Sequence, residues 1–305
     1  MSTRVQGWRK LAGASWGAPR DPQFTGDIDI DAAELLAYAD RVRMETGAHV
    51  TVTHLVGRAV AHALGRVPAM NVRLARGREH PRESIDVFFI VSTAGGSELT
   101  GIKVTAADQK SVVEIADQLE ADVQAVTDGT DADFGRAKKL LTLLPPRVLK
   151  AALGISAWLT SDLNLDLPAL GMRRQAFGGA MITSVGMWGI AHAYSPLAHY
   201  YRVPVLVLVG AVSQQPVAVA GKVLVRPVLP ITATFDHRYV DGFQAASFAH
   251  AVEEYLAHPA SFEPRTERRV PDQRSVVEDA AAAQAEGASK TTATGQAARS
   301  TTMGA

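Results

Sequence analysis

The sequence predicts an α/β protein, because segments with helical periodicity alternate with short apolar segments along most of its 305 residues. Two sets of capping residues, at 31–34 and at 111–114, mark helix starts. The run 203–209 is rich in β-branched residues and apolar on both faces, which is typical of a central strand covered on both sides. A sheet built around such a strand and packed against amphipathic helices is therefore expected.

Local start and stop signals give the approximate bounds of each element. Helices are expected at residues 31–47, 53–64, 111–127 and 243–256, where Gly47, Gly65 with Pro68, and Pro259 act as stop signals. Strands are expected at residues 85–93, 180–184, 203–212 and 222–235. The segment 213–216 and Gly221 are expected to turn the chain back, so that the last two strands pair in antiparallel fashion.

Two stretches depart from this rhythm. Residues 1–265 are expected to form one domain with a helical insertion at about 130–174, and residues 266–305 a polar tail without fixed structure. The insertion has the pattern of two short helices broken at Pro145 and Pro146, apolar on one side and basic on the other. It is predicted to be a packed helical insertion, a lid over a binding channel, or a membrane-surface contact.

Composition excludes several classes of protein. The chain has no cysteine, which rules out disulfide scaffolds, cysteine-based metal sites and cysteine nucleophiles. Its 31 Lys and Arg residues balance 31 Asp and Glu residues, so no global field favours nucleic acid. The N-terminus has no apolar signal region, and the longest apolar stretch is about half the ~20 residues that span a bilayer. A cytoplasmic protein without a transmembrane segment is expected.

Two motifs can carry chemistry. Residues 236–242 read Asp-His-Arg-Tyr-Val-Asp-Gly, at the end of a predicted strand and the start of a predicted helix. His237 lies four residues before Asp241, so the carboxylate can support either the local turn or the imidazole. Residues 178–189 place Thr183 and Ser184 at the end of an apolar strand between glycines, where a hydroxyl can face a developing oxyanion. Each motif taken alone is more typical of a turn.

Taken together, the two motifs resemble those of the acyltransferase component of 2-oxo acid dehydrogenase complexes, in its catalytic domain. That family shares its fold with chloramphenicol acetyltransferase and carries an Asp-His-Arg-x-x-Asp-Gly signature, which matches residues 236–242. Its upstream glycine-rich strand matches residues 178–186, and a helix ending in Pro-x-x-Asn matches residues 54–71. The resemblance covers about residues 20–262. It implies a chloramphenicol acetyltransferase-like two-layer sandwich with a mixed sheet and helices on one side.

The resemblance implies a CoA-dependent acyltransferase that moves an acyl group between a CoA or lipoyl-type thioester and an unknown acceptor. His237 is the implied general base that takes a proton from a thiol, and Asp241 is the carboxylate that orients it. Alignment through Gly186 places the oxyanion-stabilising hydroxyl on Thr183, with Ser184 as the alternative. Coenzyme A is then a substrate, and no metal is implied.

The resemblance also implies a homotrimer in which the histidine of one subunit faces the hydroxyl of its neighbour, and it makes Arg238 a structural ion-pair partner. Four departures favour a stand-alone acyltransferase outside a dehydrogenase complex: no lipoyl or subunit-binding domain in this chain, no proline in residues 98–104, the insertion, and the polar tail. A lipoyl group would then act in trans. The alternative is a catalytically silent trimeric scaffold or binding module, which the intact His237 and Asp241 disfavour.

Overall fold

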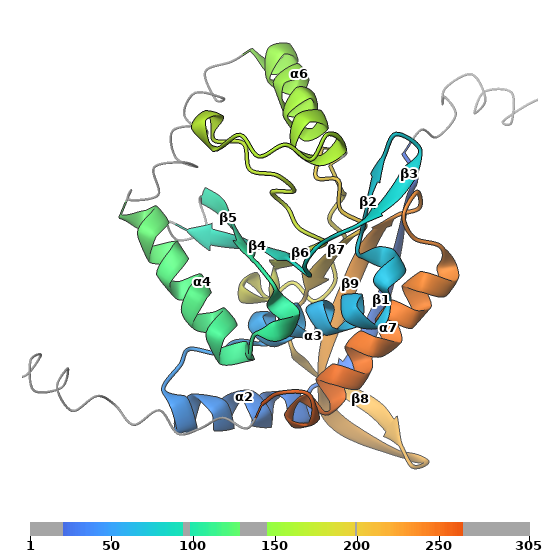
Figure 1. Cartoon of the computed structure of the whole chain (residues 1–305). Helices are drawn as coiled ribbons and strands as arrows, with labels where there is room; N and C mark the ends of the chain where they lie inside the picture. The colour runs from blue at the N-terminus through green and yellow to red at the C-terminus, as the bar shows by residue number, and fades with distance from the viewer. Residues whose placement is uncertain (1–20, 94–97, 129–144, 199, 265–305) are drawn as a thin grey trace, which may run out of the picture.

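The computed structural model describes residues 21–93, 98–128, 145–198 and 200–264, and its centre is a mixed sheet (Figure 1). The sheet order is β1 (Gln23–Asp31), β9 (Lys222–Asp236), β7 (Val205–Val209), β6 (Ala180–Ser184), β4 (Val87–Thr93) and β5 (Glu98–Val104), and β8 (Ser213–Val219) pairs with β9. Strands β4, β6 and β7 run parallel, whereas β9 is antiparallel to β1, β7 and β8. A separate hairpin consists of β2 (Val72–Ala75) and β3 (Arg78–Pro81).

Four helices cover one face of the sheet: α2 (Ala33–Thr46), α3 (Val52–Arg66), α4 (Val112–Thr127) and α7 (Gly242–Ala257) (Figure 1). Helix α3 lies very close to the sheet, because a Cβ atom at Gly57 would lie 2.2 Å from the ring of Phe89. That close contact fixes the position of α3 along the direction of β4 and β6.

The opposite face of the sheet carries a smaller apolar cluster. Phe88, Met181 and Leu206 pack there with Leu197 and Val203, which belong to the long connection before β7. Every residue of β7 is therefore buried, and the prediction of a central strand covered on both sides is confirmed.

Helix α4 begins with the predicted capping box. The Ser111 hydroxyl accepts a hydrogen bond from the backbone N–H of Glu114, and the Glu114 carboxylate accepts one from the N–H of Ser111 at 2.8 Å. This second bond lowers the pKa of Glu114. The helix ends at Thr127, as predicted.

Replacing Ser111 by alanine is expected to lower the free energy of unfolding by about 1 kcal/mol, because the backbone N–H of Glu114 at the start of α4 loses its acceptor, the Ser111 hydroxyl. Urea unfolding of Ser111→Ala beside the wild type measures the loss. An unchanged unfolding midpoint would show that the cap contributes nothing to the fold.

The predicted starts of α2, α3 and α7 are each wrong by one or two residues. Strand β1 remains paired with β9 through Asp31, so α2 begins at Ala33 and the Asp31 carboxylate accepts the N–H of Ala33 at 3.1 Å. Gly47 ends α2 with φ of 74°, as expected. Helix α3 is capped by Thr51, and it continues through Gly65 to Arg66.

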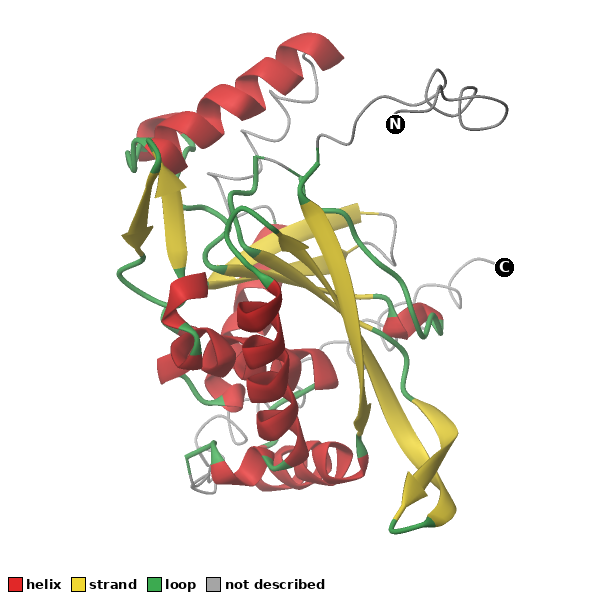
Figure 2. Cartoon of the chain, turned by 90° about the vertical axis from the view of Figure 1, so that its right-hand side faces the viewer, coloured by secondary structure: helices red, strands yellow, loops and turns green. Residues whose placement is uncertain are grey.

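The predicted turn at residues 213–216 is also wrong, because this segment is strand β8. Its side chains alternate between exposed and half-buried, which is the pattern of an edge strand that tolerates Pro216. The actual turn is formed by Ala220 and Gly221, which both have positive φ, 49° and 78°. Figure 2 shows the β8–β9 hairpin projecting away from the body.

Part of the predicted insertion lies within the described residues. Helix α6 (Pro146–Ala157) begins at the second of the two prolines and ends in a π-turn, and Arg73 donates to the carbonyls of Ser161 and Asp162 at 2.8 and 3.0 Å. Ile155 and Trp158 are more than half exposed. None of the described helices is long and apolar enough to cross a membrane. Residues 129–144 and the predicted tail at 266–305 lie outside the described residues.

Candidate active site

His237 lies in a tight turn immediately after β9. The turn is closed by hydrogen bonds from the N–H groups of Tyr239 and Val240 to the carbonyl of Asp236, and both of these side chains are buried. The backbone N–H of His237 donates to the carbonyl of Pro22 at 2.7 Å. The imidazole is exposed and packs edge-on against the ring of Phe24, with 5.1 Å between ring centroids.

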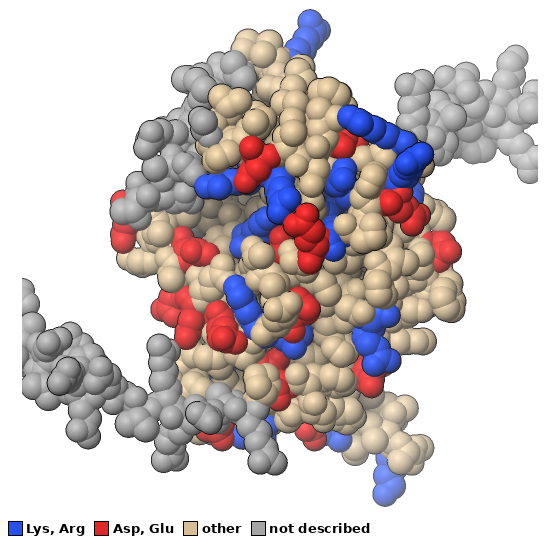
Figure 3. Space-filling model, in the orientation of Figure 1, with Lys and Arg blue, Asp and Glu red and all other residues tan. Residues whose placement is uncertain are grey.

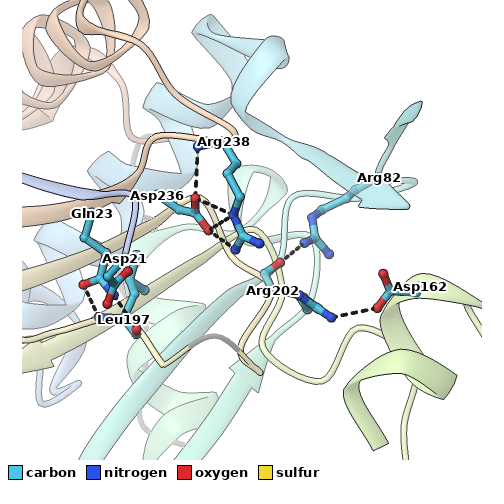
Figure 4. A network of polar contacts seen from close by, with 8 residues as sticks. All are labelled: Asp21, Gln23, Arg82, Asp162, Leu197, Arg202, Asp236 and Arg238. Carbon is cyan, nitrogen blue, oxygen red and sulfur yellow. Dashed lines mark hydrogen bonds and ion pairs between the residues drawn. The ribbon is translucent and has the colours of Figure 1, made fainter. Parts of the chain in front are cut away.

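Arg238 forms the ion pair that the resemblance implies, with Asp236 as its partner. Figure 4 shows the guanidinium and the carboxylate facing one another, and the Nε–Oδ1 distance is 2.9 Å. The hydrogen bond to Asp236 raises the pKa of Arg238. The carboxylate also accepts the N–H of Arg238 at 3.0 Å, so the pair holds the turn in one conformation.

A basic cluster lies beside this turn. Arg82 donates to the carbonyl of Arg202 at 2.9 Å, and Arg202 pairs with Asp162 of the insertion at 3.3 Å (Figure 4). Burial lowers the pKa of Arg82 to about 10. Figure 3 shows basic side chains gathered between α6 and the β2–β3 hairpin, with acidic ones among them. These contacts join the insertion to the region next to His237.

Asp241 acts as the N-cap of α7. Its carboxylate accepts the backbone N–H of Gln244 at 2.9 Å, and the Gln244 side chain accepts the N–H of Asp241 at 2.9 Å. Among the described residues, no hydrogen bond joins Asp241 to His237. The carboxylate therefore fixes the start of α7, and through it the position of the turn, while direct orientation of the imidazole stays a prediction.

Thr183 and Ser184 lie at the other end of the central strands. They end β6, beside Leu208 and Val209 of β7. The Ser184 hydroxyl donates to the carbonyl of Val209 at 3.4 Å. Both residues line a cleft of about 1020 Å³ at the carboxyl ends of the parallel strands, which is where ligands bind in many α/β proteins.

The cleft is bounded by α3, α4, the strand ends and the segment after β6. Its walls are mainly apolar, and their larger side chains include Phe89, Leu99, Leu119, Val123, Met187 and Trp188. The polar side chains that reach it include His54 from the first turn of α3. An apolar cleft with a few polar groups is typical of a site for a small organic ligand.

The structure does not bring His237 and Thr183 together within one chain. The N–H of Asp236 bonds to Pro204, so His237 lies level with the start of β7, whereas Thr183 pairs with Leu208 near its end. Five residues of strand separate the two levels, or roughly 17 Å along the strand direction. One chain therefore carries the two predicted half-sites at opposite ends of the sheet.

His54 is not among the residues that the sequence motifs single out, and its spacing of eight residues from His62 is not that of a helical metal pair. The structure places it in the cleft with Thr183 and Ser184. The sequence does contain one signal for this position. Thr51 and His54 have the spacing of a capping box, which holds the His54 ring at the start of a helix. Among the described residues, no group of three or more metal-ligating side chains occurs.

Comparison with known proteins agrees with this architecture. A family model described as the 2-oxoacid dehydrogenases acyltransferase (catalytic domain) matches residues 17–132 and 172–263, more than half of the chain. A probable dihydrolipoyllysine-residue succinyltransferase component of the mitochondrial 2-oxoglutarate dehydrogenase complex of Schizosaccharomyces pombe is 25% identical over 227 residues. The match covers 73% of this chain but 41% of that protein, so the chain spans less than half the length of this curated relative.

Two solved structures share the fold. A probable dihydrolipoamide acetyltransferase from Listeria monocytogenes has a TM-score of 0.59 at 18% identity, covering 87% of this chain and 97% of that one. Dihydrolipoamide acetyltransferase of Azotobacter vinelandii has a TM-score of 0.58 at 21% identity, covering 80% and 84%, and a serine, a histidine and an asparagine were investigated for their role in its catalytic mechanism. The predicted mixed sheet with helices on one side is confirmed. The chain belongs to the family of 2-oxoacid dehydrogenase acyltransferase catalytic domains.

Proposed function

We propose that the protein transfers an acyl group between coenzyme A and a thiol acceptor of the dihydrolipoyl type. The single observation that carries this proposal is the position of the two motifs in a fold of this family: His237 in an ordered exposed turn, and Thr183 at the edge of an apolar cleft. Both are where side chains can reach a substrate, and neither is buried in the core.

The proposed reaction needs one base and one oxyanion donor. The imidazole of His237 accepts the proton of the attacking thiol, and the sulfur forms a bond to the acyl carbon. The carbonyl oxygen then carries negative charge, to which a hydroxyl donates a hydrogen bond. When this intermediate collapses, the bond to the leaving sulfur breaks, and the leaving thiolate takes the proton from the imidazolium. No group of the protein is acylated.

Thr183 is the better candidate for the oxyanion donor. Successive residues of a strand point to opposite faces, so Thr183 shares the face of Met181, and Ser184 shares the helix-covered face of Ile182. The Ser184 hydroxyl already has the carbonyl of Val209 as a partner. Removal of one such donor costs about 10²–10³-fold in kcat in acyl-transfer enzymes.

We further infer that the complete site forms between two subunits, most simply in a homotrimer. The half-sites lie at opposite ends of one chain, so a second copy has to bring its His237 to Thr183. The Azotobacter vinelandii enzyme supports the residue roles, because its histidine and asparagine lie four residues apart, like His237 and Asp241. Its serine precedes the histidine by 52 residues, close to the spacing of both Thr183 and Ser184 from His237.

The apolar walls of the cleft favour acyl groups without charge. The test is to incubate the protein with acyl-CoAs of increasing chain length, together with succinyl-CoA and dihydrolipoamide, and to follow free CoA and acylated product. Product formation that requires His237 is expected. Full activity in the His237→Ala variant would contradict the mechanism, and no turnover across the panel would favour the scaffold alternative.

A further inference from the structure

His54 is the third residue of α3, and the packing of α3 on the sheet determines where His54 lies along the strands. Leu64, near the far end of α3, lies beside Gly179 before β6, and Gly57 lies against Phe89, which pairs with Ile182. Helix α3 therefore runs antiparallel to β6. His54 lies three residues further, about 4.5 Å along the helix.

One strand residue advances about 3.3 Å, so the step of about 4.5 Å corresponds to between one and two residues beyond Ile182. His54 is therefore level with the end of β6. The same cleft is lined by His54, Thr183 and Ser184. Because Ser184 shares the helix-covered face, His54 approaches the end of β6 from the side opposite to the face on which Thr183 lies.

The capping box decides which nitrogen of His54 carries the proton. The backbone N–H of Thr51 donates to Nδ1 at 3.2 Å, and the Thr51 hydroxyl accepts the backbone N–H of His54 at 3.4 Å. A nitrogen that accepts a hydrogen bond holds its lone pair, so the neutral ring carries its hydrogen on Nε2. Among the described residues, Nε2 has no hydrogen-bond partner.

The ring also stays neutral at physiological pH. Burial lowers the pKa of His54 to about 4, and the nearby charges of His49 and Arg43 act in the same direction. Nε2 is therefore a donor at any pH at which the protein would work, and its orientation is set by the helix start.

We propose that His54 donates a hydrogen bond from Nε2–H to the acyl carbonyl oxygen of the substrate, as a second donor that reaches it from the side of the β6 end opposite to the Thr183 hydroxyl. The inference rests on the proposed transferase function. A neutral donor held in place by the backbone needs no reorganisation when charge develops on that oxygen. It does not place a second positive charge beside the histidine that the neighbouring subunit would supply.

Three variants separate the donor from the cap. Glutamine and glutamate are the usual residues at this position of a capping box, so His54→Gln and His54→Glu both preserve the contact to Thr51. Glutamine keeps an N–H donor, whereas glutamate has none. His54→Ala lacks both donor and cap but adds no charge.

The expected result is that His54→Gln stays within about tenfold of the wild-type kcat, while His54→Glu and His54→Ala each lose about 10²-fold or more. Thermal melts are expected to show His54→Gln and His54→Glu close to the wild type, with His54→Ala lower. Equal rates for the glutamine and glutamate variants would overturn the proposal. So would an active alanine variant beside an inactive glutamate one, because charge alone would then explain the loss.

A binding measurement keeps this inference separate from the proposed function. In a His237→Ala background, calorimetry with butyryl-CoA as the probe is expected to give about tenfold weaker binding for His54→Glu and His54→Ala than for His54→Gln. If the wild type turns over no substrate, the transferase proposal fails, and this difference in affinity still supports His54 as a ligand donor. If the three His54 variants bind butyryl-CoA with equal affinity, the assignment is overturned in two cases: when their turnover is also equal, and when the wild type shows no turnover.

Discussion

Replacing Glu263 by glutamine is expected to lower the free energy of unfolding by about 3–5 kcal/mol, because it leaves a buried arginine without its counter-charge. Glu263 follows α7, and its side chain is 2% exposed, while the side chain of Arg58 in α3 is 9% exposed. The Nε–Oε1 distance between them is 3.2 Å. The guanidinium has few other partners, since Nε and Nη1 of Arg58 lack a hydrogen bond in the described structure.

Glu263 also joins two further elements. Its second carboxylate oxygen accepts the N–H of Val112, the first residue of α4, at 2.7 Å, and the hydroxyl of Tyr255 donates to the first oxygen. Burial and the charge of Glu263 raise the pKa of Tyr255, so this hydroxyl remains a donor. A glutamine keeps only one acceptor oxygen, so its amide N–H has to face either the N–H of Val112 or the guanidinium of Arg58.

Chemical denaturation of Glu263→Gln measures the loss, and Glu83→Gln is the matched control. Glu83 pairs with Arg174 at 2.9 Å, but its side chain is 71% exposed, so a change below about 1 kcal/mol is expected there. Arg58→Met in the Glu263→Gln background is expected to recover part of the stability, since it removes the unpaired charge. Equal losses at Glu263 and Glu83 would contradict this account of the core.

Mixing two inactive variants is expected to restore activity. His237→Ala lacks the proposed base and Thr183→Val lacks the proposed hydroxyl, so each alone is expected to lose about 10²-fold or more in kcat. Because one chain carries the half-sites at opposite ends of the sheet, a mixed oligomer contains interfaces that pair an intact histidine with an intact hydroxyl. Random assortment makes about a quarter of the interfaces intact.

The measurement is turnover after the two variants are unfolded, mixed at equal concentration and refolded, beside each variant treated alone. The double variant His237→Ala with Thr183→Val, mixed with wild type, is the control for subunit exchange, and it is expected to give the same fraction of active interfaces. Mixtures that stay as inactive as the single variants would contradict a site shared between subunits, provided that the control mixture exchanges.

Much of the secondary structure could be predicted because its signals are local. Ser111 and Glu114 cap α4 through contacts that span three residues, and the apolar run in β7 needs only its own side chains. The segment 213–219 was missed because its alternation is weak and contains Pro216. Its strand conformation depends on pairing with β9, which no local signal encodes.

The candidate site divides in the same way. The sequence by itself determined the identity and order of the motifs, from Thr183 to His237. It also allowed the ion pair of Arg238 to be predicted, because its partner Asp236 lies only two residues away. Only the tertiary structure decided that Asp241 caps α7, that His54 reaches the cleft, and that the two half-sites lie at opposite ends of one chain. The physical reason is strand direction. Strands β6 and β7 are parallel and β9 is antiparallel to β7, so the carboxyl end of β6, with Thr183, and the carboxyl end of β9, before His237, lie at opposite ends of the sheet along the strand direction.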